Sequence, residues 1–504
     1  MSIERVPVVI VGAGPTGVTC ATLLAQYGIE SVLLERWAGV YPAPRAVHLD
    51  DEVYRIIARL GAAERFAAIS RPAKGLRLID RTGHVLAEFC RDTQPGVHGF
   101  PQANMFDQPE LEAVLRANLE QYPAARLRGN AEVTSLAPTS SGPVRIQFTD
   151  RTDGTMHRID ADYVLGCDGA NSVVRQSIGV QMTDLDFDQR WLVVDIATDA
   201  DLNQWEGVHQ LCDSARAGTY MRIGERRYRW EFRLLPGESA ADFATVAALQ
   251  PLISRWTAQV NLDRLELIRV TEYTFRATLA QRWRRGRIFL LGDAAHLTPP
   301  FIGQGLGAGL RDAHNIAWKL AAVIRGDLPA TALDTYEAER KPHARSMIRL
   351  ALTVGRAMTA GGETGNRLRH AAVPLLVRLP GLGARVVDST TPALHASAYV
   401  RRRFGCRLVG TLYPEFALTG GYFVIISRVP LTPDQQALAE RRGATTHLVA
   451  PGSPAEKWLR GAHTDAVLVR PDNTVMASGR DITALCRLAP SFRAVPISNP
   501  APRL

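Results

Sequence analysis

Three glycine-rich turns lie far apart in the sequence and could bring bare backbone amides against one ligand. The first spans residues 12–17 and has the pattern G-x-G-x-x-G. The second is Cys167-Asp168-Gly169, and the third begins at Gly292-Asp293 and continues into the alternating glycines of residues 303–309. Because glycine loses more conformational entropy on folding than other residues, such clusters indicate that something approaches the backbone closely.

The first turn carries the spacing of a dinucleotide-binding fingerprint. Residues 6–11 form a continuous apolar run, typical of a buried parallel strand, and residues 16–26 have helical spacing. Glu35 ends the next apolar run, where the fingerprint places an acid that accepts from a ribose hydroxyl. Amides at the helix N-terminus would hold a pyrophosphate. The nucleotide contacts expected here are Gly12, Ala13, Gly14, Pro15, Thr16, Gly17, Glu35 and Arg36.

A ligand that touches all three turns must be long. In an open α/β sheet, ligands bind beyond the carboxyl ends of the strands, so the turns can converge. With a pyrophosphate at residues 12–17 and a ribose at Glu35, the carboxylate of Asp293 can accept from the hydroxyls of a ribityl chain. This set of contacts predicts FAD better than NAD.

Composition narrows the class of protein. The 504 residues are 46% hydrophobic, and the net charge of +9 comes mostly from dispersed arginines without an aromatic-interleaved basic stripe. We expect no nucleic-acid partner and a modest attraction for anionic small molecules. No secretory signal and no membrane-length apolar run is present. The six scattered cysteines lack C-x-x-C and metal spacing, which predicts a cytoplasmic protein without disulfides or a metal.

The pattern of apolar residues predicts an α/β protein with an inserted sheet. Residues 1–182 and 276–360 read as two parts of one Rossmann-like nucleotide-binding domain. Residues 183–275 alternate with period two and predict an antiparallel sheet that binds the substrate. Residues 361–404 are rich in glycine, proline and threonine and read as a linker, and residues 405–504 form a small α/β module.

One predicted hairpin separates its side chains by type. It turns at Gly224-Glu225, and its second strand places aromatic residues on one face and arginines on the other. We interpret the arginine face as an outer, solvated face. The aromatic face comprises Tyr228, Trp230, Phe232 and Leu234, and the polar face Arg227, Arg229, Glu231 and Arg233.

As a set, the three turns resemble the fingerprints of the class A flavoprotein monooxygenases, aromatic hydroxylases built like para-hydroxybenzoate hydroxylase. The matching stretches are residues 12–17 with Glu35, 167–175 and 292–300, and the resemblance covers about residues 5–360. The stretches YPAPRAVHLDDEVYRI and RWEFRLLPGE are most similar to the 3-(3-hydroxyphenyl)propionate/3-hydroxycinnamate hydroxylases. The tail resembles the thioredoxin-like C-terminal domain of phenol-hydroxylase relatives, but has no C-x-x-C.

The resemblance implies further cofactor contacts. Arg45 would lie near the pyrophosphate and a swinging flavin, and Gln108 would bond the ribityl and phosphate region. The residues near Asp168 and Arg175 are linked in the family to both FAD and NAD(P)H. Many relatives have Asn where this chain has Gly307, so only a backbone contact is carried over there. The remaining implied FAD contacts are Gly292, Asp293, Pro300, Gly303, Gly305, Leu306 and Gly307.

The implied activity is hydroxylation of a phenolic aromatic acid such as 3-(3-hydroxyphenyl)propionate, with O2 and NADH or NADPH, through a flavin hydroperoxide. A larger polyketide, antibiotic or other phenolic substrate is the alternative, and a non-catalytic binding protein on the same scaffold is a rival interpretation. A homodimer stays open. The catalytic candidates are the backbone of Pro300, Arg222 for a substrate carboxylate with Arg229 and Arg233 as alternates, and Tyr220 and His48 for the phenol.

The candidates also have simpler interpretations. Tyr220 fits a packed sheet tyrosine, and His48 fits a helix cap. His296 is expected to support its own turn.

Overall fold

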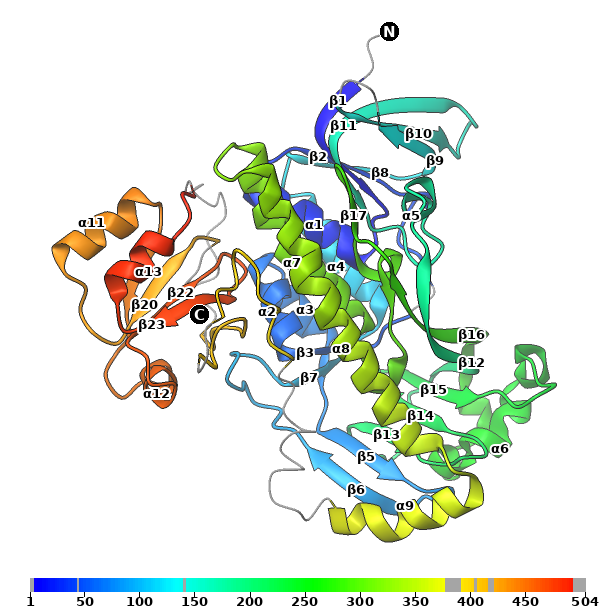
Figure 1. The fold of residues 1–504 in the computed structure, drawn as a ribbon. Coiled ribbons are helices and arrows are strands. Elements are labelled where there is room, and N and C mark those ends of the chain that lie inside the picture. Colours follow the sequence, from blue (N-terminus) through cyan, green and yellow to red (C-terminus); the bar gives the residue numbers. More distant parts are fainter. Residues whose placement is uncertain are drawn as a thin grey trace.

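The computed structural model describes residues 4–42, 45–138, 142–376, 391–402, 406–415 and 421–492. Two sheets lie one above the other on one side of the long helices α7 and α8, and a smaller C-terminal unit lies on the other side (Figure 1). Among the described residues, no helix has the length and apolar character needed to cross a bilayer.

The first sheet is parallel at its centre, as expected of a Rossmann-like domain. Its strands follow the order β17-β18-β11-β1-β2-β8, and β10 and β9 extend it antiparallel from β11. All neighbours from β18 to β8 run parallel. The strands are β1 (Glu4–Val11), β2 (Ser31–Leu34), β8 (Ala125–Arg128), β9 (Ala131–Pro138), β10 (Val144–Asp150), β11 (Met156–Gly166), β17 (Arg284–Arg285) and β18 (Ile288–Leu290).

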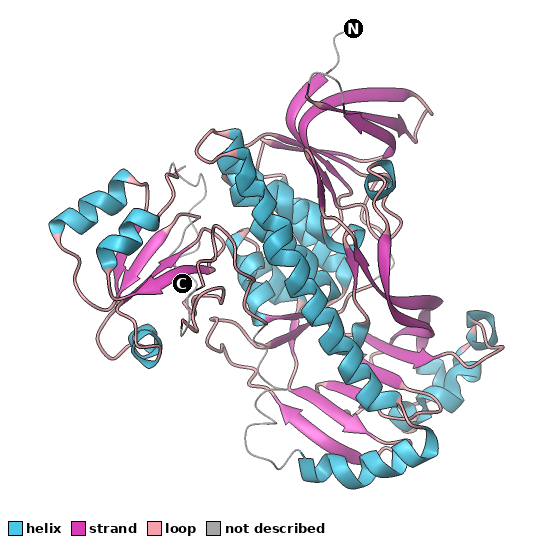
Figure 2. Cartoon of the chain, in the orientation of Figure 1, coloured by secondary structure: helices cyan, strands magenta, loops and turns pink. Residues whose placement is uncertain are grey.

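Helices cover this sheet and carry its connections (Figure 2). The helix α1 contacts both α4 and α7, so the helix after the first glycine turn is enclosed by later parts of the chain. A three-stranded sheet lies beside α2. The bounds are α1 (Pro15–Gln26), α2 (Asp51–Arg59), α3 (Ala63–Ile69), α4 (Gln108–Leu119), α5 (Val173–Ser177), α7 (Gly305–Ile324), α8 (Asp334–Thr359), β3 (His48–Asp50), β4 (Arg71–Pro72) and β7 (Ala103–Met105).

The second sheet is larger than the predicted insertion. Residues 75–90, which the sequence assigned to the nucleotide-binding part, supply two of its strands. They join through parallel pairing of β5 with β13, a contact between distant segments that local patterning does not reveal. The order β19-β16-β12-β15-β14-β13-β5-β6 comprises β5 (Gly75–Ile79), β6 (Val85–Cys90), β12 (Met182–Ala197), β13 (Val208–Leu211), β14 (Gly218–Arg222), β15 (Arg227–Arg233), β16 (Glu266–Ala280) and β19 (His296–Leu297).

The predicted hairpin is confirmed, but its arginine face is not solvated. The aromatic face of β15 packs with α6 (Val246–Thr257) in an apolar core. On the other face, Arg229 is buried in an ion pair with Asp195 at 2.7 Å. Its Nη1 also donates to the carbonyl of Arg45 at 3.1 Å. The expectation of an outer face was wrong because the nucleotide-binding part covers this side of the sheet.

The C-terminal unit has the topology expected of a thioredoxin-like fold. In the order β21-β20-β22-β23, the first pair is parallel and the other pairs are antiparallel. Cys406 and Cys486 are free thiols. The elements are β20 (Val424–Ser427), α11 (Pro433–Arg441), β21 (Thr445–Leu448), α12 (Pro454–Gly461), β22 (Ala466–Val469), β23 (Val475–Gly479) and α13 (Ile482–Leu488).

The predicted linker of residues 361–404 contains a helix. The helix α9 spans Gly362–Leu376 and packs along β6. Residues 377–390 of the predicted linker lie outside the described residues. The glycines and prolines of this region masked the helical signal between them.

A buried charge cluster joins the C-terminal unit to the long helices. Arg470 donates to Glu339 of α8 at 2.9 Å and is paired with Asp472. Lys319 of α7 donates to the same Glu339 oxygen at 2.8 Å. The side chains of Arg470, Glu339 and Lys319 are fully buried. Each charge depends on its partners because no water reaches it to replace them.

Replacing one member of this cluster should therefore be costly. We expect Arg470→Met to lower the free energy of unfolding by about 3–5 kcal/mol, since it leaves Glu339 without one of its cations. Denaturant unfolding measures the change. Arg441→Met, at an exposed arginine of α11, is the control and should change stability by less than about 0.5 kcal/mol. A similar small effect for both variants would contradict this account.

We expect low pH to lower the free energy of unfolding through protonation of His209 in the unfolded chain. Its Nδ1 accepts from Nε1 of Trp256 at 3.1 Å, and burial together with the nearby charge of Arg77 lowers the pKa of His209 to about 4. Its contribution to stability is complete above pH 6.5 and is lost as the pH falls toward 4, because only the unfolded chain takes up the proton.

We expect His209→Gln to reduce the loss of stability between pH 7 and pH 5 by about 2 kcal/mol. Denaturant unfolding at the two pH values measures this loss. His157→Gln removes an exposed imidazole and should leave the pH dependence as in the unmodified protein. Equal pH dependence in all three proteins would show that His209 does not titrate on unfolding.

Candidate active site

The three glycine turns meet at the ends of three neighbouring strands. They follow β1, β11 and β18, which lie side by side and parallel. A Cβ on Gly12 would lie 2.5 Å from the carbonyl oxygen of Cys167, and a Cβ on Gly292 would lie 2.9 Å from Oγ1 of Thr16. Gly12 and Gly292 also have φ of +95° and +57°. Glycine is therefore required at both positions, and the predicted convergence is confirmed.

Two other glycines border open space where a cofactor would lie. A Cβ on Gly14 or on Gly305 would meet no atom within 4 Å. Gly14 caps the N-terminus of α1, and Gly305 begins α7. The N-termini of two helices thus have open space beside them, which suits an anionic pyrophosphate at one and an electron-accepting ring at the other. These residues fit FAD.

The first turn and Glu35 hold each other in place. The carboxylate of Glu35 is buried and accepts from the amide of Ala13 at 2.7 Å and from the amide of Trp37 at 3.0 Å. A carboxylate has lone pairs left after two such bonds, so it can also accept from a ribose hydroxyl. Arg36 is exposed, and its guanidinium lies over the ring of Trp37 at 5.1 Å.

Asp293 is available for a ligand. No described residue donates a hydrogen bond to its half-buried carboxylate. Burial raises its pKa, and the charges of His296 and Arg45 oppose the rise. Hydroxyl donors of a ribityl chain would satisfy this carboxylate and stabilise its ionised form.

Asp312 of α7 holds the turn that contains Asp293 through a hydrogen bond to the turn's backbone. Asp312 accepts from the amide of Gly292 at 3.0 Å and pairs with His296 at 2.7 Å and Arg340 at 2.8 Å. Burial alone would raise the pKa of Asp312, but Arg340 and His296 outweigh it and lower the pKa. The expected supporting role of His296 is confirmed.

Gln108 positions the Arg45 segment. At the start of α4, its Oε1 accepts from the amides of Arg45 and Ala46 at 2.9 and 2.6 Å. Its Nε2 donates to Glu112 at 2.8 Å. The side chain of Arg45 is exposed, 5.7 Å from the ring of Tyr41. A direct bond from either residue to FAD stays a prediction.

Asp168 and Arg175 also connect the turns to one another. Asp168 accepts from Oγ of Ser172, the N-cap residue of α5, at 2.5 Å and from the amide of Val174 in the first turn of that helix at 3.0 Å. Arg175 donates to the carbonyl of Ala294 at 3.1 Å, which ties the second turn to the third. Contact of Asp168 with a nucleotide stays a prediction.

His48 lies against the loop that begins α7. Gly303 has φ of +62°, and a Cβ there would lie 2.8 Å from Nδ1 of His48. The amide of Gly303 donates to the carbonyl of Pro300 at 2.9 Å. Burial and the nearby charge of Arg91 lower the pKa of His48 to about 4. The structure thus brings together three predicted residues, and the imidazole is neutral at pH 7.

Close packing around position 307 explains why this chain has glycine there. In the first turn of α7, beside the half-buried Leu306, a Cβ on Gly307 would lie 2.9 Å from both Val53 and the guanidinium of Arg311. That arginine donates to Gln304, which caps α7, at 3.0 Å and to Asp50 at 2.7 Å. A side chain at position 307 would disturb this contact.

Two charged residues near His48 were missed by the sequence analysis. Arg91 follows β6, and no described residue forms an ion pair or hydrogen bond with its guanidinium. Burial lowers its pKa, against the pull of Asp50 and Asp51. Burial, reinforced by the like charges of Asp50 and Glu52, raises the pKa of Asp51 to about 7. The place of Arg91 was hidden because residues 75–90 were not assigned to the second sheet, and the environment of Asp51 depends on burial that the sequence does not show.

The other substrate candidates are engaged elsewhere. Arg222 pairs with Glu206 at 2.9 Å, and Arg233 donates to the carbonyl of Ala215 at 2.8 Å. Tyr220 is buried among the aromatic residues that pack on α6, on the face of the sheet opposite Arg229. These positions give no support to the roles predicted for Arg222, Arg233 and Tyr220.

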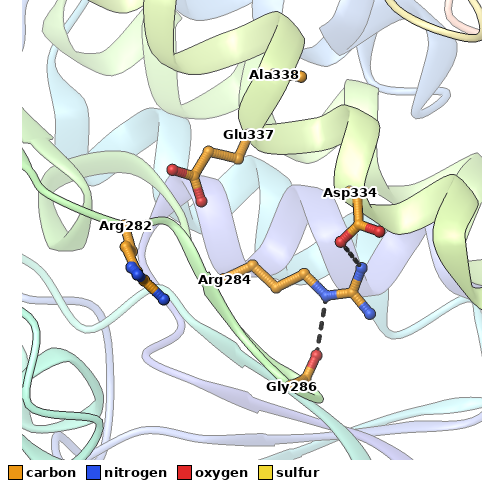
Figure 3. A pocket seen from close by; sticks show the side chains of 6 residues that line it. All are labelled: Arg282, Arg284, Gly286, Asp334, Glu337 and Ala338. Atoms are coloured by element: carbon orange, nitrogen blue, oxygen red, sulfur yellow. Dashed lines mark hydrogen bonds and ion pairs between the residues drawn. The ribbon is translucent and has the colours of Figure 1, made fainter.

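Two hollows among the described residues lie apart from the turns. An open hollow of about 620 Å³ is lined by residues of β17 and α8, and Figure 3 shows Arg284 bridging from the carbonyl of Gly286 to Asp334. A second cavity, of about 350 Å³, lies between α2, α7, α8 and the C-terminal unit, with Arg55, His314 and Trp458 in its wall. Neither is lined by the glycines of the three turns.

Comparison with known proteins gives consistent matches. Residues 5–351 match the family model described as FAD binding domain. The chain is 34% identical over 527 residues to a probable NADH-specific resorcinol 4-hydroxylase of Rhodococcus jostii (strain RHA1), covering 99% of this chain and 97% of that protein. It is 37% identical over 381 residues to a 3-(3-hydroxy-phenyl)propionate/3-hydroxycinnamic acid hydroxylase of Burkholderia cenocepacia (strain HI2424), covering 75% and 68%.

Solved structures share the fold. Aklavinone-11 hydroxylase, in a complex with FAD and aklavinone, superposes with a TM-score of 0.76 at 23% identity, covering 97% of this chain and 99% of that one. A p-nitrophenol 4-monooxygenase from Pseudomonas putida DLL-E4 gives a TM-score of 0.70 at 22% identity, covering 76% and 97%.

The open space at Gly14 provides a test of the cofactor cradle. The residue has φ of −71°, which valine adopts, so we expect Gly14→Val to fold normally but to bind FAD at least about tenfold more weakly. FAD titration followed by flavin fluorescence measures the change. Gly39→Val, at another glycine with no atom near its Cβ position, is the matched control and should bind FAD normally. Unchanged affinity in Gly14→Val would place the pyrophosphate elsewhere.

Proposed function

This chain belongs to the FAD binding domain family of flavin-dependent aromatic hydroxylases, and from this premise we propose that it hydroxylates a single-ring phenol with a substituent meta to its hydroxyl. The first candidate substrate is 3-(3-hydroxyphenyl)propionate. Bound FAD supplies the reaction with oxidation of NADH or NADPH and activation of O2. The protein must then bind the phenol, orient it and exclude water.

The names of the two relatives support this substrate class. Resorcinol carries a second hydroxyl meta to the first, and 3-(3-hydroxyphenyl)propionate carries an acid chain at the same position. A pocket that places one hydroxyl at a fixed point therefore serves both molecules, and the residues around the meta substituent decide between them.

The observation that carries the proposal is a neutral imidazole, His48, on which the charge of Arg91 acts, while no described residue forms an ion pair with that arginine. His48 lies against Gly303 in the loop of Pro300, and its low pKa leaves one ring nitrogen as an acceptor. It would orient the phenol hydroxyl rather than remove its proton. Arg91, whose charge acts on His48, would receive the carboxylate of the acid chain.

Resorcinol is the second candidate, because the alignment with the resorcinol hydroxylase relative covers nearly the whole chain. The resorcinol hydroxylase relative aligns over 99% of this chain, including the C-terminal unit, whereas the acid hydroxylase relative aligns over 75%. The larger polyketide-type substrates of the alternative have support only from fold similarity at 23% identity. The homodimer, the cytoplasmic location and the choice between NADH and NADPH stay predictions.

The test is oxidation of NADH and NADPH by the FAD-loaded protein with each phenol, together with the mass of the product. Faster oxidation with a product one oxygen heavier than 3-(3-hydroxyphenyl)propionate supports the first candidate. The same result with resorcinol alone supports the second. Oxidation that yields only hydrogen peroxide with both phenols would overturn the proposed substrate class.

Arg91→Met separates the two candidates within one protein. We expect KM for 3-(3-hydroxyphenyl)propionate to rise about 10- to 100-fold, as for the loss of a hydrogen bond to a charged group, and KM for resorcinol to stay the same. Steady-state kinetics measures both. Arg77→Met is the control, because Arg77 lies on the same hairpin but is paired with Glu88 at 2.6 Å. An equal rise for both phenols would exclude a carboxylate contact.

A further inference from the structure

Three metal-ligating side chains meet on the surface, outside the residues assigned to hydroxylation. Asp80 and His84 belong to the turn between β5 and β6, and His370 lies on α9, which runs beside that hairpin (Figure 1). One ligand atom from each residue lies within 4.8 Å of the other two. The cluster could not be predicted from local patterns, because His370 lies far along the chain from Asp80 and His84.

The hairpin turn fixes the carboxylate of Asp80. Its Oδ1 accepts from the amide of Thr82 at 2.8 Å, the hydroxyl of Thr82 at 2.6 Å and the amide of His84 at 2.9 Å. Its Oδ2 lies 3.4 Å from Nδ1 of His370. Burial would raise the pKa of Asp80, but these hydrogen bonds outweigh it and lower the pKa, so the carboxylate is ionised at neutral pH.

Polar contacts hold α9 against the same hairpin. Arg81 donates to both oxygens of Glu363, at 3.2 and 3.1 Å. Asn366 donates to Asp213 at 3.1 Å. Glu363, Asn366 and His370 follow one another at helical spacings of three and four, so they share one face of α9. The face that is anchored to the second sheet is therefore the face that presents His370.

The two imidazoles can approach the carboxylate. The ring centroids of His84 and His370 are 5.6 Å apart, and both side chains are exposed, so neither has to leave a packed position. Tetrahedral Zn²⁺ takes imidazole nitrogen and carboxylate oxygen at about 2.0–2.2 Å, which a small rotation of exposed rings can satisfy. Two imidazoles disfavour Mg²⁺ and Ca²⁺, which take oxygen ligands.

We propose that Asp80, His84 and His370 bind one Zn²⁺ ion, which joins α9 to the β5–β6 hairpin. Water fills the fourth position. The ion replaces the weak pairing of Asp80 with His370 by three bonds between two elements. It stabilises the end of the second sheet, on the hairpin that leads into Arg91.

Calorimetric titration of ZnCl2 into the full-length, FAD-loaded protein, stripped of metals beforehand, tests the site. We expect one equivalent to bind, and the affinity to fall more than about tenfold in His84→Ala and in His370→Ala. MgCl2 should give no binding. Equal affinity in the unmodified protein and His370→Ala would overturn the proposal.

Two control variants test whether Zn²⁺ binds to other exposed imidazole or thiol side chains instead. His157→Ala removes an exposed imidazole elsewhere, and Cys90→Ser removes an exposed thiol on β6. Both should bind Zn²⁺ as the unmodified protein does, and loss of binding in Cys90→Ser alone would assign the ion to that thiol instead. Zn²⁺ should also raise the melting temperature of the unmodified protein but not that of His370→Ala. A rise of equal size in both would contradict the link between α9 and the hairpin.

Discussion

The position of α7 depends on two buried ion-pair clusters that begin at neighbouring residues. Arg311 bonds Asp50, Glu52 and Gln304, and Asp312 bonds Arg340, His296 and the amide of Gly292. One cluster secures the loop that begins the helix, and the other secures the turn that carries Asp293. Buried charges tolerate little displacement from their partners, so the N-terminal end of α7 is fixed relative to the sheet.

Local features of the fold could be read from the sequence, because the reason for them is local. The turns themselves require glycine at positions 12 and 292, because φ there is +95° and +57°, which residues with a side chain rarely adopt. The alternation in residues 227–234 correctly gave the two faces of β15. It could not show what covers each face, and for this reason Arg229 was expected in solvent and found in a buried ion pair.

The parts of the site that escaped prediction depend on pairing between distant segments. Arg91 follows β6, which joins the second sheet through β5, and no property of residues 75–91 specifies that β5 pairs with β13. The same holds for the low pKa of His48, which follows from burial and from the charge of Arg91. The two side chains proposed to bind the substrate are thus placed by long-range contacts, whereas the glycine turns proposed to hold FAD come from short motifs.

The cluster of Lys319, Glu339, Arg470 and Asp472 has a consequence for how such chains can diverge. A tail attached only through apolar contacts can be exchanged for another apolar tail with little penalty, since apolar surfaces need no specific partner group. Here a replacement tail would again bury Lys319 and Glu339, and it would have to supply a cation in the place of Arg470. Exchange for a tail without that cation therefore requires simultaneous substitution at positions on α7 and α8, and the tail and the helices must evolve together.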